Sequence, residues 1–273
     1  MIIGLIQPLV GDKKEENLQQ VLIQLESAAT EGNADLLILP ELWNTPFINR
    51  KILEHQDEWD FMLEALQKEA KRLNIWIVAG SLPYQNEGKL YNACAIINSN
   101  GEVAAITAKT HLLEVHTAKH SYYEKDVFTS GNSLCKVATP WGNLGVLICY
   151  DNRFCETYRL IAQDCFLIAA VCGFNEQVGQ KHWKPLFQTR AMENQVFIAA
   201  VNPAKADYGS YTSYGHSMIV SPDGQVLAQL GSEPGNLIYE IDPEEVARIR
   251  KRSPFWKIRR TDLKVIPVPE EKS

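Results

Sequence analysis

The apolar positions of the chain follow two alternating periods, one typical of buried strands and one typical of amphipathic helices. Residues 1–7 form a short and nearly continuous apolar run, and after them Leu18, Val21, Leu22 and Leu25 recur at helical spacing. A strand followed by a helix is typical of an α/β fold. The same periodicity predicts further strands at residues 35–39, 75–81, 91–98, 101–108, 134–138, 144–148, 165–171, 195–201, 217–220, 225–230 and 237–241, and further helices at residues 59–73, 153–163, 182–194 and 243–250.

Two turn signals divide this pattern. The Asn-Gly pair that ends residues 98–101 and the Ser-Pro-Asp-Gly segment at residues 221–224 each separate two apolar runs, as in a hairpin. An α/β run followed by a hairpin therefore occurs twice, which predicts two similar halves packed as layers. We find no linker between the halves and predict one domain over residues 1–267, followed by a loose tail at residues 268–273.

Composition narrows the class of protein. Hydrophobic residues make up 45% and charged residues 22% of the 273 residues, which is ordinary for a globular enzyme or binding protein. The net charge of −6 disfavours nucleic acid as a partner. The first apolar run has no basic leader and no run is long enough to cross a bilayer, so we expect a cytoplasmic location and no membrane partner. The six cysteines include no C-x-x-C pair and are expected to be reduced thiols, without a zinc site or disulfides.

One cysteine stands at a chemically favourable place. The predicted strand 144–148 ends on Cys149, and polar residues and a helix follow. Unpaired N–H groups and the dipole at a helix N-terminus favour an anion, so this thiol is expected to ionise more readily and to act as a nucleophile. The alternative is a buried cysteine with a structural role only.

Two other polar residues end predicted strands. Glu41 follows strand 35–39 and Lys109 follows strand 101–108. Because the carboxyl ends of parallel strands meet at one edge of a sheet, Glu41, Lys109 and Cys149 are expected to converge there. Glu124 lies within residues 110–133, a long stretch without periodicity of a kind that is usually functional. The alternative for such a glutamate or lysine is a solvated loop residue.

Three segments carry a resemblance to a known family. Residues 39–43 (Leu-Pro-Glu-Leu-Trp), 109–112 (Lys-Thr-His-Leu) and 145–154 (Gly-Val-Leu-Ile-Cys-Tyr-Asp-Asn-Arg-Phe) resemble, in order and spacing, the signatures of the nitrilase, or carbon–nitrogen hydrolase, superfamily. The resemblance implies a four-layer αββα sandwich with two pseudo-equivalent halves. It also implies a homo-oligomer, commonly a dimer, and a reaction that needs no metal or organic cofactor.

The resemblance further implies roles for the matching residues. Glu41 is similar to the general base, Cys149 to the nucleophile, and Lys109 to the cation that stabilises the oxyanion with the backbone N–H of Tyr150. Glu124 is similar to a second glutamate that orients the lysine and the substrate. The implied cycle forms a cysteine thioester with release of ammonia or an amine and then hydrolyses it to the acid.

The substrate implied by the resemblance is a small carboxamide. Segments 148–154, 173–175 and 182–183 resemble the ω-amidase group, which acts on short dicarboxylic monoamides such as α-ketoglutaramate and succinamate. By topology, Phe174 and Asn175 are expected to line the pocket. The chain departs from that group by one missing residue and a missing glycine between Arg159 and Leu167, and by Ala170-Val171-Cys172 in place of a stretch that often contains proline.

Other functions stay open at this point. One alternative is an amidase of the same family that acts on deaminated glutathione or on another amide. A second is a non-catalytic thiol sensor or interaction protein that keeps the fold. His111, His116 and His120 match no usual zinc spacing and are expected to hydrogen-bond within their loop.

Overall fold

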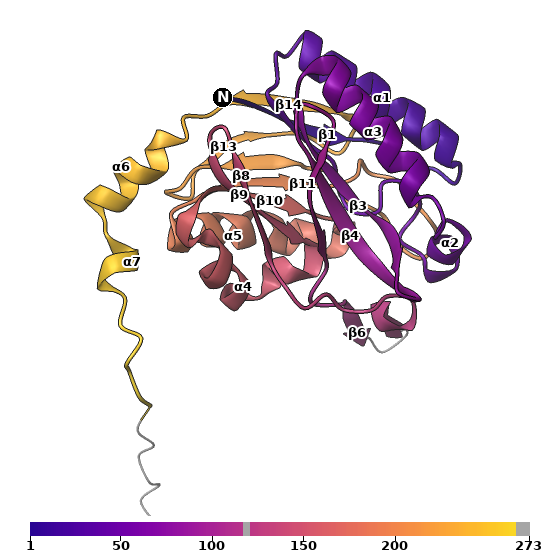
Figure 1. The fold of residues 1–273 in the computed structure, drawn as a ribbon. Coiled ribbons are helices and arrows are strands. Elements are labelled where there is room, and N and C mark those ends of the chain that lie inside the picture. The colour runs from indigo at the N-terminus through magenta and orange to yellow at the C-terminus, as the bar shows by residue number, and fades with distance from the viewer. Residues whose placement is uncertain (117–120, 266–273) are drawn as a thin grey trace, which may run out of the picture.

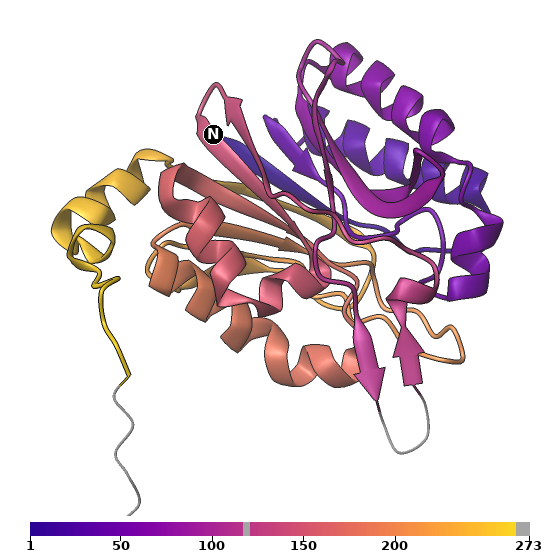
Figure 2. The same cartoon turned by 60° about the horizontal axis from the view of Figure 1, so that its bottom comes forward.

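The computed structural model describes residues 1–116 and 121–265, so His120 and the predicted tail at residues 268–273 lie outside the described residues. Two six-stranded sheets lie face to face between two pairs of helices, as Figures 1 and 2 show. This arrangement confirms the predicted αββα sandwich of two similar halves.

The first sheet has the strand order β14-β1-β2-β3-β4-β5. Its three central strands are parallel, whereas β14, β4 and β5 join antiparallel at the two edges. The strands are β1 (Ile2–Gln7), β2 (Leu36–Ile38), β3 (Trp76–Asn86), β4 (Lys89–Ile97), β5 (Val103–Ala108) and β14 (Gly235–Glu240).

The second sheet repeats this plan with the order β13-β12-β11-β10-β9-β8. Its central strands β9, β10 and β11 are parallel, and β8, β12 and β13 are antiparallel to their neighbours. The strands are β8 (Cys135–Thr139), β9 (Gly142–Ile148), β10 (Cys165–Val171), β11 (Phe197–Val201), β12 (Met218–Val220) and β13 (Val226–Gln229).

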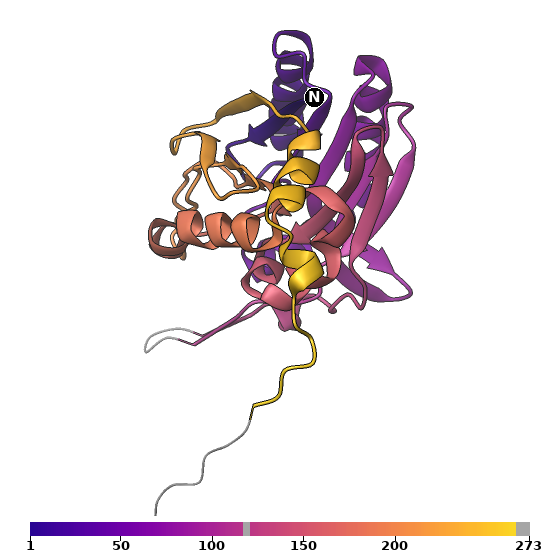
Figure 3. The same cartoon turned by 90° about the vertical axis from the view of Figure 1, so that its left-hand side faces the viewer.

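Helices cover the outer face of each sheet. Helices α1 (Lys14–Thr30) and α3 (Trp59–Leu73) lie on the first sheet, and α4 (Cys155–Ile161) and α5 (Glu176–Asn194) lie on the second (Figure 2). Helices α6 (Glu244–Arg252) and α7 (Phe255–Ile258) stand beside the sandwich, as Figures 1 and 3 show. None of the helices in residues 1–116 and 121–265 combines the length and apolar character needed to cross a bilayer.

Alternation along each strand builds two separate cores. In β2, Leu36 points into the core between the two sheets, whereas Leu37 points into the core beneath α1 and α3. The helical period of 3.6 residues places Val21 and Met62 of the covering helices in the second of these cores. A strand in the middle of a four-layer sandwich is therefore apolar on both faces, which explains the nearly continuous apolar runs in the sequence.

Several boundaries differ from the predicted ones. Strand β3 continues to Asn86 and turns through Glu87 and Gly88, both with positive φ (49° and 73°), into β4. The added end of β3 contains Pro83, which cannot donate a ladder hydrogen bond, and the polar pair Gln85 and Asn86, so the apolar pattern ended the predicted strand at residue 81. Helix α5 begins at Glu176, before the predicted start at residue 182, because the Asn175 side chain accepts a hydrogen bond from the Val178 N–H and caps the helix.

The stretch 110–133 contains short elements that its sequence did not predict. Strands β6 (Glu114–His116) and β7 (Ser121–Tyr123) pair as a hairpin that extends from the sandwich in Figure 2. The 3-10 turn η1 (Glu124–Asp126) follows and places Glu124 inside the molecule. Helix α2 (Asn49–Glu54), also unpredicted, buries only Ile52, so its sequence carries little apolar periodicity.

Candidate active site

The predicted residues converge at the carboxyl ends of strands from both sheets. Glu41 follows β2, Lys109 follows β5, and Cys149 follows β9. The three side chains are almost completely buried, with exposed fractions of 2%, 0% and 8%. The structure brings the three residues together, but Glu41 and Lys109 follow strands of the first sheet and Cys149 follows a strand of the second, so they do not share one sheet edge.

Lys109 is the centre of a buried charge cluster. Its Nζ lies 2.8 Å from Glu41 Oε1 and 2.9 and 2.8 Å from the two carboxylate oxygens of Glu124. The Lys109 backbone is fixed as well, because its N–H donates to Asn92 O and its carbonyl accepts from Gly131 N–H. The ammonium therefore occupies one position between two carboxylates.

Asn92 is a further member of the cluster that sequence reasoning did not identify. Its Nδ2 donates to Glu41 Oε1 at 2.9 Å and to Glu124 Oε1 at 3.1 Å. Asn92 lies within β4, where this buried polar residue interrupts an otherwise apolar run. That interruption is the only local signal, and the sequence does not show which carboxylates the amide contacts.

The nucleophile candidate sits in an unusual backbone conformation. Cys149 has a φ of 44° and begins the 3-10 turn η2 (Cys149–Arg153) directly after β9. A positive φ is uncommon for a residue with a side chain and often marks a functional site. Tyr150, the proposed oxyanion donor, is the second residue of this turn, where backbone N–H groups lack a partner within the turn.

Electrostatic interactions set the protonation of the cluster. Burial alone would lower the pKa of Lys109, but the charges of Glu124 and Glu41 outweigh it and hold that pKa well above its usual value. Burial raises the pKa of Glu41 despite the opposing effect of Lys109. The site therefore contains a permanently charged ammonium beside a carboxylate that accepts a proton more readily than an exposed one.

The thiol of Cys149 does not ionise readily in the resting site. Its contact with the Cys172 thiol, its burial and the charge of Glu41 all raise the pKa of Cys149. This direction is the opposite of the one expected from the sequence; Lys109 does lower the pKa of Cys149, but these effects outweigh it. Glu41 and Cys149 each act on the pKa of the other, so the Glu41 carboxylate is a candidate acceptor for the thiol proton.

Asp151 ties the lysine segment to the cysteine turn. Its Oδ1 accepts from Thr110 Oγ1 at 2.6 Å and from the His111 N–H at 2.8 Å, and the His111 Nδ1 lies at the same distance. His111 also stacks on Phe154, with ring centroids 3.8 Å apart. His111 thus hydrogen-bonds Asp151 of the cysteine turn, whereas the sequence led us to expect partners within its own loop.

Arg190 supports the same turn from behind. It donates to the backbone oxygens of Asn152 and Arg153 at 3.1 and 2.7 Å and pairs with Glu193 at 2.7 Å. Across the described ranges, no group of three or more histidine, cysteine, aspartate or glutamate side chains is arranged to hold a metal ion.

Phe174 and Asn175 lie close to the cluster but are engaged elsewhere. The Phe174 ring packs edge to face on Trp183, and the Asn175 side chain caps α5. Their neighbour Gly173 is closer to the chemistry, because a Cβ at this position would lie 2.8 Å from Glu41 Oε2. The contribution of Phe174 and Asn175 to substrate binding stays a prediction.

A narrow cavity opens beside Glu41. It measures about 10 Å³, which is room for about one water molecule. Its lining comes from the segment after β2, from Gly173 and from the loop between β11 and β12, and includes Glu41, Thr45, Phe47, Tyr208, Tyr211 and Ser213.

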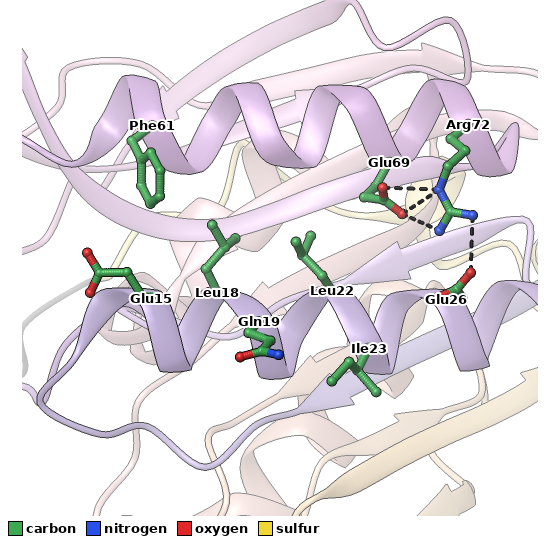
Figure 4. A pocket seen from close by; sticks show the side chains of 9 residues that line it. All are labelled: Glu15, Leu18, Gln19, Leu22, Ile23, Glu26, Phe61, Glu69 and Arg72. Atoms are coloured by element: carbon green, nitrogen blue, oxygen red, sulfur yellow. Dashed lines mark hydrogen bonds and ion pairs between the residues drawn. The ribbon is translucent and has the colours of Figure 1, made fainter.

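A wider groove of about 320 Å³ lies elsewhere, between α1 and α3. Figure 4 shows its apolar floor, formed by Leu18, Leu22 and Phe61, and the ion pairs of Arg72 with Glu69 and Glu26 at one end. None of the residues of the catalytic cluster lines this groove, so its size does not identify it as the active site.

The segment that is one residue short lies away from the cluster. Residues 159–167 form the end of α4, a 3-10 turn and the start of β10, and Cys165 pairs with Asn143 at the beginning of β9. Cys149 follows the opposite end of β9. Cys172, by contrast, follows the site end of β10, and its carbonyl accepts the Glu41 N–H.

The fold and this cluster define a class of hydrolase. The family model described as carbon–nitrogen hydrolase matches residues 3–251, and the chain belongs to that family. It is 36% identical over 264 residues to Omega-amidase NIT2 of Xenopus tropicalis, covering 96% of this chain and 95% of that protein.

Solved structures agree with this assignment. The NitFhit protein of C. elegans has a TM-score of 0.90 at 29% identity, over 97% of this chain and 66% of that one. Nit3 of Saccharomyces cerevisiae, a nitrilase superfamily member, has a TM-score of 0.87 at 30% identity, over 95% of this chain and 96% of that one. The protein is an enzyme that hydrolyses amide carbon–nitrogen bonds.

Proposed function

We propose that this amidase is an ω-amidase that hydrolyses the terminal amide of short dicarboxylic monoamides, such as succinamate and α-ketoglutaramate, through a thioester on Cys149. The observation that carries the proposal is the position of Glu41, which hydrogen-bonds the Lys109 ammonium and whose charge acts on the Cys149 thiol. The similarity to Omega-amidase NIT2 supports the choice of substrate class.

The first half of the cycle forms the thioester. The Cys149 proton passes to Glu41 as Sγ attacks the amide carbonyl carbon, and the oxyanion receives hydrogen bonds from Lys109 and the Tyr150 N–H. Each preorganised donor of this kind is worth about 3–4 kcal/mol in the transition state. The tetrahedral intermediate then expels ammonia, which takes the proton from Glu41.

The second half hydrolyses the thioester. Glu41 Oε2 has no hydrogen-bond partner among the described residues and borders the narrow cavity. This oxygen accepts a proton from a water that attacks the thioester carbonyl. The thiol of Cys149 is the leaving group and regains the proton, so no net charge accumulates over the cycle. Glu124 and Asn92 orient the lysine throughout.

The test is ammonia release from a panel of amides. Succinamate and α-ketoglutaramate are compared with deaminated glutathione, butyramide and a nitrile, using the wild type, Cys149→Ala and, as a matched control, the exposed Cys155→Ala. We expect turnover of the short monoamides, its loss in Cys149→Ala and its retention in Cys155→Ala.

Two outcomes contradict the proposal. Preferred turnover of deaminated glutathione would show that the substrate has a longer acyl chain than the short monoamides. Turnover that survives Cys149→Ala would show that Cys149 is not the nucleophile. Alkylation of Cys149 in a wild type that turns over none of the amides would favour a thiol sensor or interaction protein with the same fold.

We also propose that the chain forms a homodimer. Helix α7 has no buried residue, and Phe255, Ile258 and Leu263 expose 46%, 66% and 71% of their surface. Apolar side chains gathered in a terminal segment favour burial against a second copy. Sedimentation equilibrium is expected to give twice the chain mass of 30.8 kDa, and Ile258→Asp to shift the mass toward a single chain.

A further inference from the structure

Several hydroxyl groups near Glu41 lack an assigned function. Within the described ranges, Thr45 Oγ1 and Tyr122 OH are buried atoms without a hydrogen-bond partner. Buried polar atoms are nearly always paired, since leaving one unpaired costs about 1–3 kcal/mol. Thr45 is 1% exposed and lines the same narrow cavity as Glu41.

Tyr211 contributes a third hydroxyl to this cavity. Its oxygen accepts the Phe47 N–H at 2.7 Å, which fixes the position of the phenol. The Tyr211 proton finds no acceptor within hydrogen-bonding distance in the described part of the chain. Burial raises the pKa of Tyr211, so the phenol stays neutral and remains a donor.

Tyr122 faces the same region from the β6–β7 hairpin. Its ring centroid lies 5.8 Å from that of Phe47, which also lines the cavity. Burial is the main cause that raises the pKa of Tyr122, and Glu124, Lys109, Glu41 and Tyr211 act on it electrostatically. This phenol is therefore near the charge cluster and also stays protonated.

We propose that the hydroxyls of Thr45, Tyr122 and Tyr211 form the subsite that binds the distal carboxylate of the substrate, which makes these residues determinants of specificity. This inference rests on the proposed ω-amidase function. A carboxylate has about four acceptor sites. Three O–H donors can satisfy it when one of them is shared between two of these sites. Hydrogen bonds from a hydroxyl to an ionised carboxylate are short and roughly twice as strong as those between neutral groups.

The residues that line the cavity favour recognition of the carboxylate by neutral hydrogen-bond donors. No arginine, lysine or histidine lines it among the described residues. A buried cation, Lys109, lies close to this wall, with its Nζ 5.5 Å from the Phe47 ring centroid, but it is already bonded to both glutamates. The protein thus recognises the carboxylate by hydroxyl groups and leaves the lysine charge for the oxyanion.

The size of the cavity restricts the acyl chain. Because the space holds about one water molecule, a four-carbon acyl group enters only when side chains of the cavity wall move. Tyr208 supports this wall, since it stacks on Tyr211 with ring centroids 4.9 Å apart. Its own hydroxyl donates to Val10 O at 2.7 Å and is not available to the substrate.

The experiment compares kcat/KM for succinamate and butyramide, which differ by a carboxylate in place of a methyl group. We expect Tyr211→Phe, Tyr122→Phe and Thr45→Val each to lower the succinamate-to-butyramide ratio by about 10- to 100-fold, as loss of a hydrogen bond to a charged group implies. The matched control is Tyr208→Phe, which removes a phenol hydroxyl from the same wall and is expected to keep the ratio.

The outcomes separate the two proposals. A wild type without preference for succinamate over butyramide overturns the ω-amidase function, whatever the variants do. A wild type with this preference that all three variants retain overturns the hydroxyl subsite alone. Equal losses for both substrates in every variant also overturn it, because such losses indicate structural support rather than carboxylate recognition.

Discussion

Glu124 binds the Lys109 ammonium through both carboxylate oxygens, at 2.9 and 2.8 Å. Glu41 contacts the same ammonium through Oε1 alone. Glu124 is in turn fixed by the Leu113 N–H, which donates to its Oε2 at 2.6 Å. The second glutamate is therefore a support for the lysine, and this leaves the other oxygen of Glu41 free for proton transfer.

Glu124→Gln is expected to lower kcat/KM by about 10- to 100-fold, because the neutral amide accepts one hydrogen bond from Lys109 in place of two charge-assisted ones. The fold should persist, since Glu41 still neutralises the buried ammonium. Steady-state kinetics with succinamate and a thermal melt test this prediction. Full activity in Glu124→Gln would mean that the lysine needs no second carboxylate.

The acidic limb of the pH profile is expected above the range of an ordinary glutamate. The base must be ionised to act, and burial raises the pKa of Glu41, so activity is lost as the pH falls through that raised value. Asn92→Ala removes a donor to the ionised Glu41 and should move the limb to still higher pH. A profile of kcat/KM that is unchanged in Asn92→Ala would contradict this account of the amide.

Cys172→Ala is expected to make Cys149 react at lower pH. The contact with Cys172 is the largest cause that raises the pKa of Cys149, so its removal lowers that pKa. The measurement is the pH dependence of inactivation by iodoacetamide. Cys165→Ala is the matched control, because Cys165 is also buried but lies at the far end of β10 and has a pKa raised to about 12 mainly by burial. If the pH midpoint of inactivation is the same in the wild type and in Cys172→Ala, the contact with Cys172 does not raise the pKa of Cys149.

Gly173→Ala is expected to lower activity by about 100-fold. The added Cβ would lie 2.8 Å from Glu41 Oε2, so the carboxylate must shift, and displacements near 1 Å have effects of this size. Gly235→Ala is the matched control, because nothing lies within 4 Å of a Cβ at that position. Similar losses in both variants would indicate a general effect of the substitution.

The sequence by itself determined the elements that carry the chemistry. Apolar runs that end on Glu41, Lys109 and Cys149 are local patterns, whereas the meeting of these ends depends on how the two sheets pack, because Cys149 follows a strand of the second sheet. The two repeated α/β runs likewise predicted two layered halves. The order and spacing of the three motifs indicated the family, which the comparisons confirm.

Only the tertiary structure decided how these residues act on one another. Asn92 reaches both glutamates because β4 and β5 pair in a register that places Ala93 opposite Ala108, next to Lys109. The raised pKa of Cys149 depends on Cys172, which the parallel register of Ile148 with Val171 brings alongside it. Such effects arise from burial and from contacts between distant segments, and no local pattern of residues encodes either.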